Sequence, residues 1–331
     1  MSQVKAPWIS ARQARHLARW RLIGKIAFWA QHKGKGRDLC ERVFGHALKQ
    51  MLAEARHLPP ISVPTDGATR LYVATCERDL LQTIWSVGSL QFWLAEKLPV
   101  IFQSDGSMTP ETQAMLTAKF PGCRIVGKEE ANKIADAKLE KYPLCRVYRQ
   151  AGPCLFARKL FDAFFHAGNS RILTMDSDIL FFRVPDDLLD PLPGPTVLRH
   201  HCEPQTDLTA CRELMEKFPE ISLNLNSGLT LRGPGYLDLD ELETIIAWFL
   251  DNAEKLGLRP GCDQLVTSVL AGRRGSVQLS HLYSNHPAAL RSFGAGLISM
   301  HYHSWSRYLF ALEGLPLLAQ RARAAAKNRV D

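Results

Sequence analysis

Two aspartates, Asp176 and Asp178, stand one residue apart directly after the apolar run 171–175. Carboxylate oxygens are the ligands that hard divalent ions prefer, and a bound ion can bridge the phosphates of a nucleotide. Such an ion would neutralise the negative charge that develops when a nucleoside diphosphate leaves. Because a lone Asp-x-Asp is also common at turns, the pair predicts a metal site only with support from the rest of the chain.

That support comes from three polar motifs further along the sequence. They are Asn226-Ser227-Gly228, the pair Asp263-Gln264, and an apolar run that ends in His301-Tyr302-His303. A neutral imidazole at the end of a strand is a competent ligand for Mn²⁺. Since His301 and His303 lie on the same face of an extended chain, either could complete a metal site with the two aspartates.

The elements that must position these residues alternate along the chain. Apolar runs at 71–74, 99–102, 123–126 and 171–175 predict strands, and helical periodicity marks residues 80–94, 110–120 and 155–167. This alternation indicates an α/β fold with a largely parallel sheet covered by helices. Ligands bind such sheets beyond the carboxyl ends of the strands, so residues 75–78 and Asp105 are further candidates.

The order of the motifs resembles that of retaining glycosyltransferases of the GT-A fold, particularly those like glycosyltransferase family 8. Members of that group have an Asp-x-Asp after a hydrophobic strand, an Asn-Ser-Gly, an Asp-Gln that opens a helix, and a late strand that ends in His. The resemblance covers residues 71–308, and its opening Leu-Tyr-Val-Ala-Thr-Cys is similar to the family's first strand. It implies a Rossmann-like, nucleotide-diphospho-sugar transferase fold with a mostly parallel, twisted central sheet.

The resemblance also implies roles for individual residues. The metal ligands would be Asp176, Asp178 and His301, with His303 as the alternative to His301. The donor sugar would be held by Asn226, Asp263 and Gln264, and one of the last two would face the anomeric carbon.

Five residues are expected to contact the nucleotide or its diphosphate. Arg307 stands where the family has a diphosphate-binding Lys, although the family's Lys-Pro-Trp is here Arg307-Tyr308-Leu309. Residues 156–160 are similar to the family's Tyr-Ala-Arg-Leu helix, which favours Arg158 with Lys159 as the reserve. Thr75 and Asp105 are candidates by their position at strand ends alone.

Together these residues predict transfer of a sugar from a nucleotide-diphosphate sugar, expected to be a UDP-sugar, with Mn²⁺ or Mg²⁺. The acceptor would be a glycan, a lipid-linked molecule or another compound, and the anomeric configuration would be retained. Two alternatives remain open. A haloacid-dehalogenase-type phosphatase also has Asp-x-Asp after a strand, and a non-catalytic protein with this fold could dock on a membrane.

Charge and composition indicate which partners and which domain organisation to expect. The net charge is +8, and residues 1–37 contain nine Lys or Arg and no acid, which suggests peripheral contact with an anionic surface such as a membrane. The segment has no nucleic-acid-binding motif, so no nucleic-acid partner is expected. We expect a basic, helical extension and linker over 1–66, with a helix near 39–55, a GT-A domain over 67–318, and a basic tail over 319–331.

The expected location is the cytoplasm, on or near the inner face of the membrane. The eight cysteines occur singly, which favours reduced thiols, and no segment approaches the roughly 18 apolar residues of a membrane span. No secretory leader is recognisable. Two smaller motifs have structural interpretations: Asp186-Asp187 predicts a helix start, and His200-His201-Cys202 fits no zinc spacing and predicts a loop near the acceptor.

Overall fold

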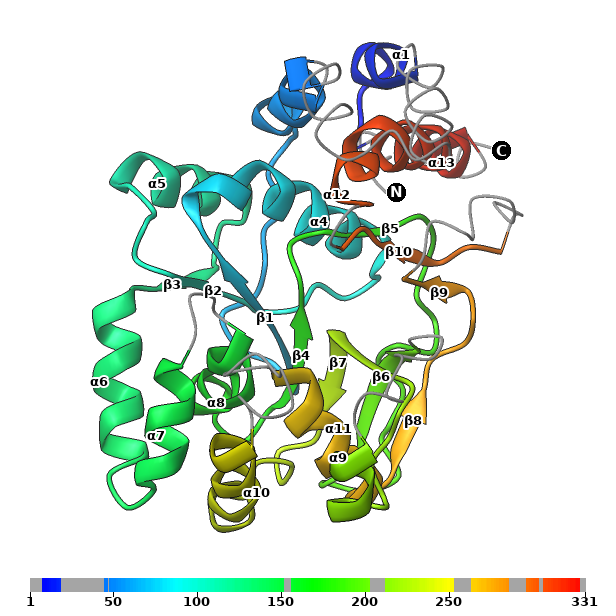
Figure 1. The fold of residues 1–331 in the computed structure, drawn as a ribbon. Coiled ribbons are helices and arrows are strands. Elements are labelled where there is room, and N and C mark those ends of the chain that lie inside the picture. The colour runs from blue at the N-terminus through cyan, green and yellow to red at the C-terminus, as the bar shows by residue number, and fades with distance from the viewer. Residues whose placement is uncertain are drawn as a thin grey trace.

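A seven-stranded sheet forms the centre of the molecule in the computed structural model (Figure 1). The structure describes residues 8–18, 45–46, 48–151, 156–202, 212–252, 263–285, 296–303 and 306–327. The strand order is β3-β2-β1-β4-β7-β6-β8. The strands are β1 (Thr69–Thr75), β2 (Val100–Ser104), β3 (Arg124–Val126), β4 (Arg171–Met175), β6 (Leu198–Cys202), β7 (Leu225–Arg232) and β8 (Ser276–Gln278).

One strand of this sheet runs against the others. β7 pairs antiparallel with both of its neighbours, β4 and β6, while the other described pairings within this seven-stranded sheet are parallel. The amino end of β7 therefore lies at the edge of the sheet where β1, β2 and β4 have their carboxyl ends. The expected mostly parallel sheet is confirmed, with this reversal as an addition.

Helices cover both faces, because alternate residues of the strands are apolar on opposite sides. Leu71 and Val73 of β1 belong to one core, whereas Tyr72 lies in another. The helices after the first strand are α4 (Leu80–Trp93), α5 (Pro110–Lys119), α6 (Lys128–Lys138), α7 (Pro143–Gln150), α8 (Phe156–Ala167), α9 (Arg212–Lys217), α10 (Leu239–Asn252) and α11 (Asp263–Arg274). The helices predicted at 80–94, 110–120 and 155–167 are thus present as α4, α5 and α8.

A second, three-stranded sheet joins distant parts of the chain. β5 (Ile179–Phe181) follows β4 almost directly, and it pairs antiparallel with β10 (Ser299–His301). β10 in turn pairs parallel with β9 (Tyr283–Ser284). The second sheet therefore brings the late histidines beside the Asp-x-Asp.

The two ends of the described chain pack together above the sheet (Figure 1). α1 (Ala11–Ala18) contacts α13 (Leu315–Lys327), which follows α12 (Arg307–Leu309) and a π-helical turn (Phe310–Gly314). Just before α1, the indole of Trp8 stacks on Phe92 of α4 with 5.5 Å between ring centroids. The expected boundary between residues 318 and 319 falls inside α13, whose Ala319 and Ala322 are buried.

Two predictions about local structure are wrong, and a third concerns a helix of which the structure describes only a part. Asp186 and Asp187 lie in a turn rather than at a helix start, and His200 to Cys202 lie in β6 rather than in a loop. Of the helix expected at 39–55, residues 45–46 and 48–53 are helical and Glu54–His57 form a 3-10 turn. Residues 19–44 lie outside the described part. No helix among the described residues is long and apolar enough to cross a membrane.

A buried ion pair fixes α8 against the sheet. Arg149 at the end of α7 donates to both carboxylate oxygens of Asp162, from Nε at 2.6 Å and Nη2 at 2.8 Å. Gln103 of β2 donates to the same carboxylate at 2.5 Å, and Tyr72 of β1 donates to Gln103. Asp162 is three residues from Lys159 on the same helix. The helical turn that carries Lys159 is therefore held by β1 and β2, through Tyr72 and Gln103, and by α7 through Arg149.

We expect Arg149→Met to lower the free energy of unfolding by about 3–5 kcal/mol, because it leaves a buried carboxylate without its cation. Urea denaturation measures the change. The matched control is Arg124→Met, which removes an exposed pair with Glu130 (2.5 Å) and should cost less than about 1 kcal/mol. Equal losses for the two variants would contradict the role given to the buried pair.

Candidate active site

The Asp176–Asp178 turn is held from two sides at the carboxyl end of β4. The backbone N–H of Asp176 donates to the carbonyl of Gly228 in β7 at 2.8 Å. From below, the hydroxyl of Ser86 in α4 contacts the carbonyls of Asp176, at 3.3 Å, and Ile179. Since Ser86 is completely buried, the turn is fixed by groups that water does not reach.

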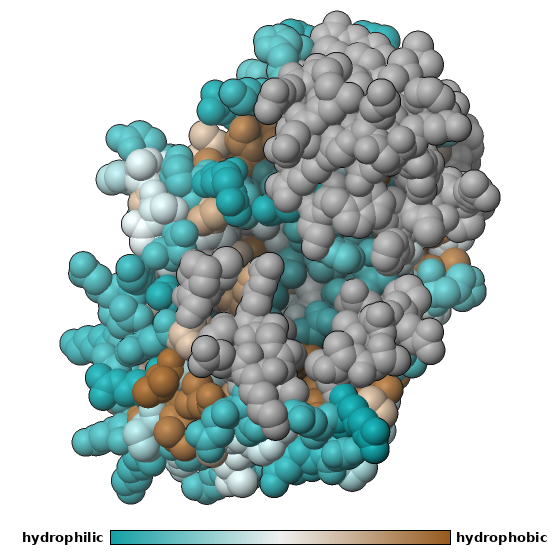
Figure 2. Space-filling model, viewed as in Figure 1, coloured by the Kyte–Doolittle hydropathy of each residue, from teal (hydrophilic) through white to brown (hydrophobic). Residues whose placement is uncertain are grey.

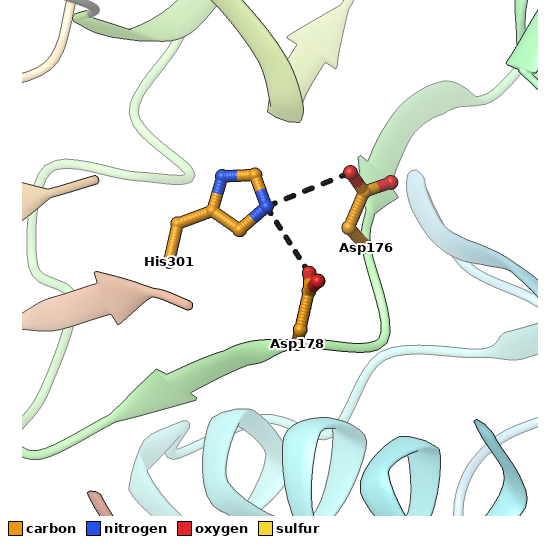
Figure 3. Close-up of side chains that lie close together, drawn as sticks. All are labelled: Asp176, Asp178 and His301. Carbon is orange, nitrogen blue, oxygen red and sulfur yellow. Dashed lines mark ion pairs between the residues drawn. The ribbon is translucent and has the colours of Figure 1, made fainter. Parts of the chain in front are cut away.

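The register of the second sheet places His301 against this turn. His301 pairs with Ile179, and the N–H of Tyr302 donates to the carbonyl of Asp178 at 2.8 Å. The imidazole Nε2 of His301 lies 3.1 Å from Asp178 Oδ1 and 3.7 Å from Asp176 Oδ2 (Figure 3). One ligand atom from each of the three residues lies within 4.8 Å of the others, which is a spacing that a single metal ion can bridge.

Asn226 determines which nitrogen of His301 faces the acids. Its Oδ1 lies 3.2 Å from His301 Nδ1 and also accepts the N–H of Gly228 at 2.9 Å. Because an amide oxygen can only accept hydrogen bonds, the contact favours the tautomer of His301 that has its proton on Nδ1. That tautomer leaves the lone pair of Nε2 directed at the aspartates. Asn226, predicted to contact the donor sugar, thus orients the imidazole of His301 through its amide oxygen.

Three features fit this cluster to a divalent ion. Asp178 Oδ1 and His301 Nε2 are buried, and neither makes a hydrogen bond within the described part of the chain. Burial opposes ionisation of Asp178, but the charges of His301 and Arg307 outweigh it and lower its pKa. Burial of His301 opposes its protonation, but the charges of Asp178 and Asp176 outweigh burial and raise its pKa. A metal ion would take the place of that proton.

Gly228 leaves the space that the His301 ring occupies. A Cβ at this position would lie 2.3 Å from His301 Cε1 and 2.9 Å from Asn226 Oδ1. Both contacts are shorter than a carbon atom tolerates. The glycine of the Asn-Ser-Gly motif is therefore required by the imidazole packed on it, which gives the motif a physical reason.

We expect Gly228→Ala to weaken Mn²⁺ binding by about 10- to 100-fold, because it displaces the imidazole and the amide that orients it. Titration with Mn²⁺, followed by electron paramagnetic resonance of the free ion, measures the change. Gly127→Ala is the control, since nothing lies within 4 Å of its added Cβ. Unchanged affinity in Gly228→Ala would contradict the assignment of His301.

Lys159 of α8 bridges two acids of the site. Its Nζ lies 2.6 Å from Asp176 Oδ1 and 3.6 Å from Asp263 Oδ2. Burial works against its charge, but Asp176 and Asp263 outweigh burial and raise its pKa. Arg158, which was expected to contact the nucleotide or its diphosphate, makes none of these contacts, and its Nη1 is buried without a hydrogen bond in the described part. Its role with the ligand stays a prediction. Lys159, the reserve candidate, is the residue beside the acids.

The start of α11 brings the Asp-Gln pair to the same place. Asp263 is 3% exposed, and its Oδ2 makes no hydrogen bond among the described residues. Burial raises its pKa despite the nearby charge of Lys159. Gln264 accepts the N–H of Ser227 at 3.4 Å, which ties α11 to the Asn-Ser-Gly motif. Asp263 therefore faces the cluster from the side of Lys159.

Arg307 reaches the cluster from the opposite side. Its Nε lies 3.2 Å from Asp178 Oδ2, and its Nη2 lies 2.9 Å from Asp79 Oδ2. Nη2 also donates to Gln82 at 3.4 Å. Burial acts against the charge of Arg307, but the two carboxylates outweigh it and raise its pKa. Asp79 was not predicted, because the candidate segment after the first strand ended at residue 78.

The remaining predicted residues lie around the cluster and are not part of it. Nε2 of His303 contacts the carbonyl of Asn285 at 2.9 Å, so His301 is the histidine that completes the described cluster. Thr75 is bonded to Thr83 through their hydroxyls at 2.6 Å. Asp105 accepts the N–H of Ser107 at 2.8 Å. The roles of Thr75 and Asp105 with a nucleotide stay predictions.

A half-buried acid contacts the tyrosine that lies between the two histidines in the sequence. Glu313 of the π-helical turn lies 3.5 Å from the hydroxyl of Tyr302, and burial raises its pKa to about 8, against a lowering by that hydroxyl. The neutral acid therefore stabilises the folded state. This contribution is complete below the ordinary carboxyl pKa near 4.5 and is lost as the pH rises through about 8.

We expect Glu313→Gln to raise the melting temperature relative to the wild type at pH 9 and to change it little at pH 4.5. The glutamine stays neutral at every pH, so it avoids the cost of a buried carboxylate. Thermal unfolding across this pH range measures the difference. A gain that is the same at both ends of the range would show that Glu313 does not titrate as described.

The sheet order and the position of the cluster define the class of fold, which is the expected GT-A fold of glycosyltransferases. Among solved structures, the chain is similar to the galactosyltransferase LgtC in complex with donor and acceptor sugar analogues, at 14% identity and a TM-score of 0.51. The match covers 78% of this chain and 95% of that one. It shows the fold.

A second solved structure is the apo form of mouse xyloside xylosyltransferase 1. It is 13% identical, and the match covers 73% of this chain and 98% of that one with a TM-score of 0.49. No model of a known protein family matches the sequence, and no curated protein matches it.

Proposed function

We propose that the protein is a metal-dependent glycosyltransferase that takes a sugar from a nucleotide-diphosphate sugar. The observation that carries the proposal is the cluster of Asp176, Asp178 and His301 at the edge of the sheet where β4 has its carboxyl end, in which Asp178 and His301 are buried. In an open α/β sheet this is the edge at which ligands bind. Lys159 and Arg307 add a cation on each side of the cluster, which suits a substrate with a negatively charged diphosphate.

Asp176, Asp178 and His301 would hold Mn²⁺ or Mg²⁺, and the bound ion would act as a Lewis acid that stabilises the departing diphosphate. Asn226 keeps His301 in the tautomer that can bind the ion. Arg307 would offer a planar, permanently charged guanidinium to the departing diphosphate. These residues supply the chemistry of leaving-group stabilisation.

The donor sugar would lie against Lys159, Asp263 and Gln264. Asp263 Oδ2 is buried and makes no hydrogen bond in the described part, so it can accept a sugar hydroxyl. The Lys159 ammonium lies 3.6 Å from that oxygen and fixes its direction. Retention of configuration, with Asp263 or Gln264 facing the anomeric carbon, is part of the proposal, as is a UDP-sugar as donor.

The acceptor is proposed to be a glycan or a lipid-linked molecule, as in the synthesis of polysaccharides. The solved LgtC structure, which shares the fold, contains an acceptor sugar analogue. A cytoplasmic position with peripheral membrane contact through the basic segment 1–37 belongs to the same proposal. Arg12 and Arg15 of α1 are exposed and agree with such contact.

The structure weighs against both alternatives. In a haloacid-dehalogenase-type phosphatase the Asp-x-Asp loop opens the domain, whereas here β1, β2 and β3 precede β4 in the same sheet. A non-catalytic protein would have no reason to keep Asp178 Oδ1 and His301 Nε2 buried and, within the described part of the chain, without a hydrogen bond, since burying polar groups in this way is costly.

We expect UDP or a UDP-sugar with Mn²⁺ to raise the melting temperature. A ligand at about 100 times its Kd adds about 2.7 kcal/mol of stability, which is several degrees for a protein of this size. Asp178→Asn should abolish the shift, and Asp66→Asn, which changes an exposed acid far from the cluster, should keep it.

A panel of nucleotide sugars then identifies the donor by release of the nucleoside diphosphate. A melting shift that survives in Asp178→Asn would refute the metal site. Rapid hydrolysis of aryl phosphates with no response to nucleotide sugars would favour the phosphatase instead.

A further inference from the structure

Asp79, to which none of the roles above is assigned, lies beside the cation of the site. It is the last residue of the 3-10 turn Glu77–Asp79, which connects β1 to α4. One guanidinium, that of Arg307, therefore spans two carboxylates from different loops, at 2.9 Å from Asp79 and 3.2 Å from Asp178. The side chain of Asp79 is only 14% exposed, so solvent screens this pair less than it screens a surface pair.

The two carboxylates differ in what else they face. Asp178 has His301 on its other oxygen and belongs to the metal cluster, whereas Asp79 lies outside that cluster. A divalent ion on Asp178 would repel the guanidinium, and the guanidinium on Asp178 would oppose the ion. Arg307 and a metal ion thus compete for the negative charge of Asp178.

Asp79 provides a second carboxylate to which Arg307 can bind when a metal ion occupies Asp178. Burial acts to raise its pKa, but Arg78 and Arg307 outweigh burial and lower it, so the carboxylate stays ionised. Its other partner, Arg78, is 77% exposed and lies 3.1 Å away, which makes it a weak competitor for Asp79. Arg307 can therefore stay on Asp79 when it yields Asp178.

We propose that Asp79 is a positioning residue that draws Arg307 away from Asp178, so that Asp178 can bind a divalent ion while the guanidinium stays at the site. The inference rests on the proposed function, because it assumes the metal site. Without Asp79, Arg307 would rely on Asp178 alone and would exclude the ion more strongly. Asp79 therefore raises metal affinity without touching the metal.

The test is a double-mutant cycle of Mn²⁺ affinity, measured without nucleotide by electron paramagnetic resonance of the free ion. We expect Arg307→Gln to bind Mn²⁺ about tenfold more tightly than the wild type, and Asp79→Asn to bind it several-fold more weakly. In the double variant the effect of Asp79→Asn should disappear, because the residue through which it acts is gone. Asp79→Glu should restore most of the wild-type affinity.

Two controls separate this effect from a loss of structure or of general charge. Asn is as good a helix N-cap as Asp, so Asp79→Asn preserves the start of α4. Asp66→Asn removes the carboxylate that lies 2.7 Å from Arg70, away from the site, and should leave Mn²⁺ affinity unchanged. Melting curves of all variants identify any that is unfolded, and Asp79→Ser then serves as the second variant.

An Asp79→Asn protein with wild-type Mn²⁺ affinity would overturn the inference. The same loss in the wild-type and Arg307→Gln backgrounds would also overturn it, since that result is a general charge effect. If the wild type binds no Mn²⁺, the metal site of the proposed function fails and the inference fails with it. If the wild type binds Mn²⁺ and Asp79→Asn does not change the affinity, the inference is refuted but the proposed metal site stands.

Discussion

Acids and bases alternate through the centre of this protein, and the site depends on that alternation. The row runs Asp263, Lys159, Asp176, His301, Asp178, Arg307, Asp79, with 2.6 to 3.7 Å between neighbouring charged atoms. Asp176 and Asp178 each lie between two bases of the row, and the carboxylates at its two ends, Asp79 and Asp263, contact Arg307 and Lys159. Burying several like charges in one place would be prohibitive, whereas paired charges recover much of the desolvation cost. A divalent ion would enter at the middle of the row, where two carboxylates share only a histidine.

Much of the surrounding structure serves to keep this row in place. Ser86 and the carbonyl of Gly228 hold the loop of the two aspartates, and the Arg149–Asp162 pair fixes the helix that carries Lys159. The loop of the two aspartates is therefore held by hydrogen bonds to uncharged groups. The buried ion pair of Asp162 lies one helical turn away from Lys159 and does not contact the acids of the site. Precise placement matters because a metal ion tolerates little error in the positions of its ligands.

The fold shared with LgtC does not by itself assign an activity, because one fold supports many functions. The proposed activity depends on three buried atoms that make no hydrogen bond within the described part of the chain, namely Asp178 Oδ1, His301 Nε2 and Asp263 Oδ2, since leaving such atoms without a ligand is costly. The resemblance to family 8 implies a Lys at the position of Arg307. A guanidinium in place of an ammonium can bridge two carboxylates at once, which is the geometry that Arg307 adopts.

The sequence by itself determined the elements whose signal is local. Apolar periodicity located β1, β2, β3 and β4 and the helices α4, α5 and α8. Asp176 and Asp178 after a strand indicated a metal site only together with the later motifs Asn226-Ser227-Gly228, Asp263-Gln264 and His301-Tyr302-His303. The tertiary structure decided the rest: the reversed direction of β7, the register of β10 on β5 that brings His301 to the aspartates, the contact of Lys159 with Asp176, and the contact of Asp79 with Arg307. The physical reason is that strand direction, register and charge pairing depend on contacts between residues far apart in the chain. A local pattern of apolar and polar residues does not encode those contacts.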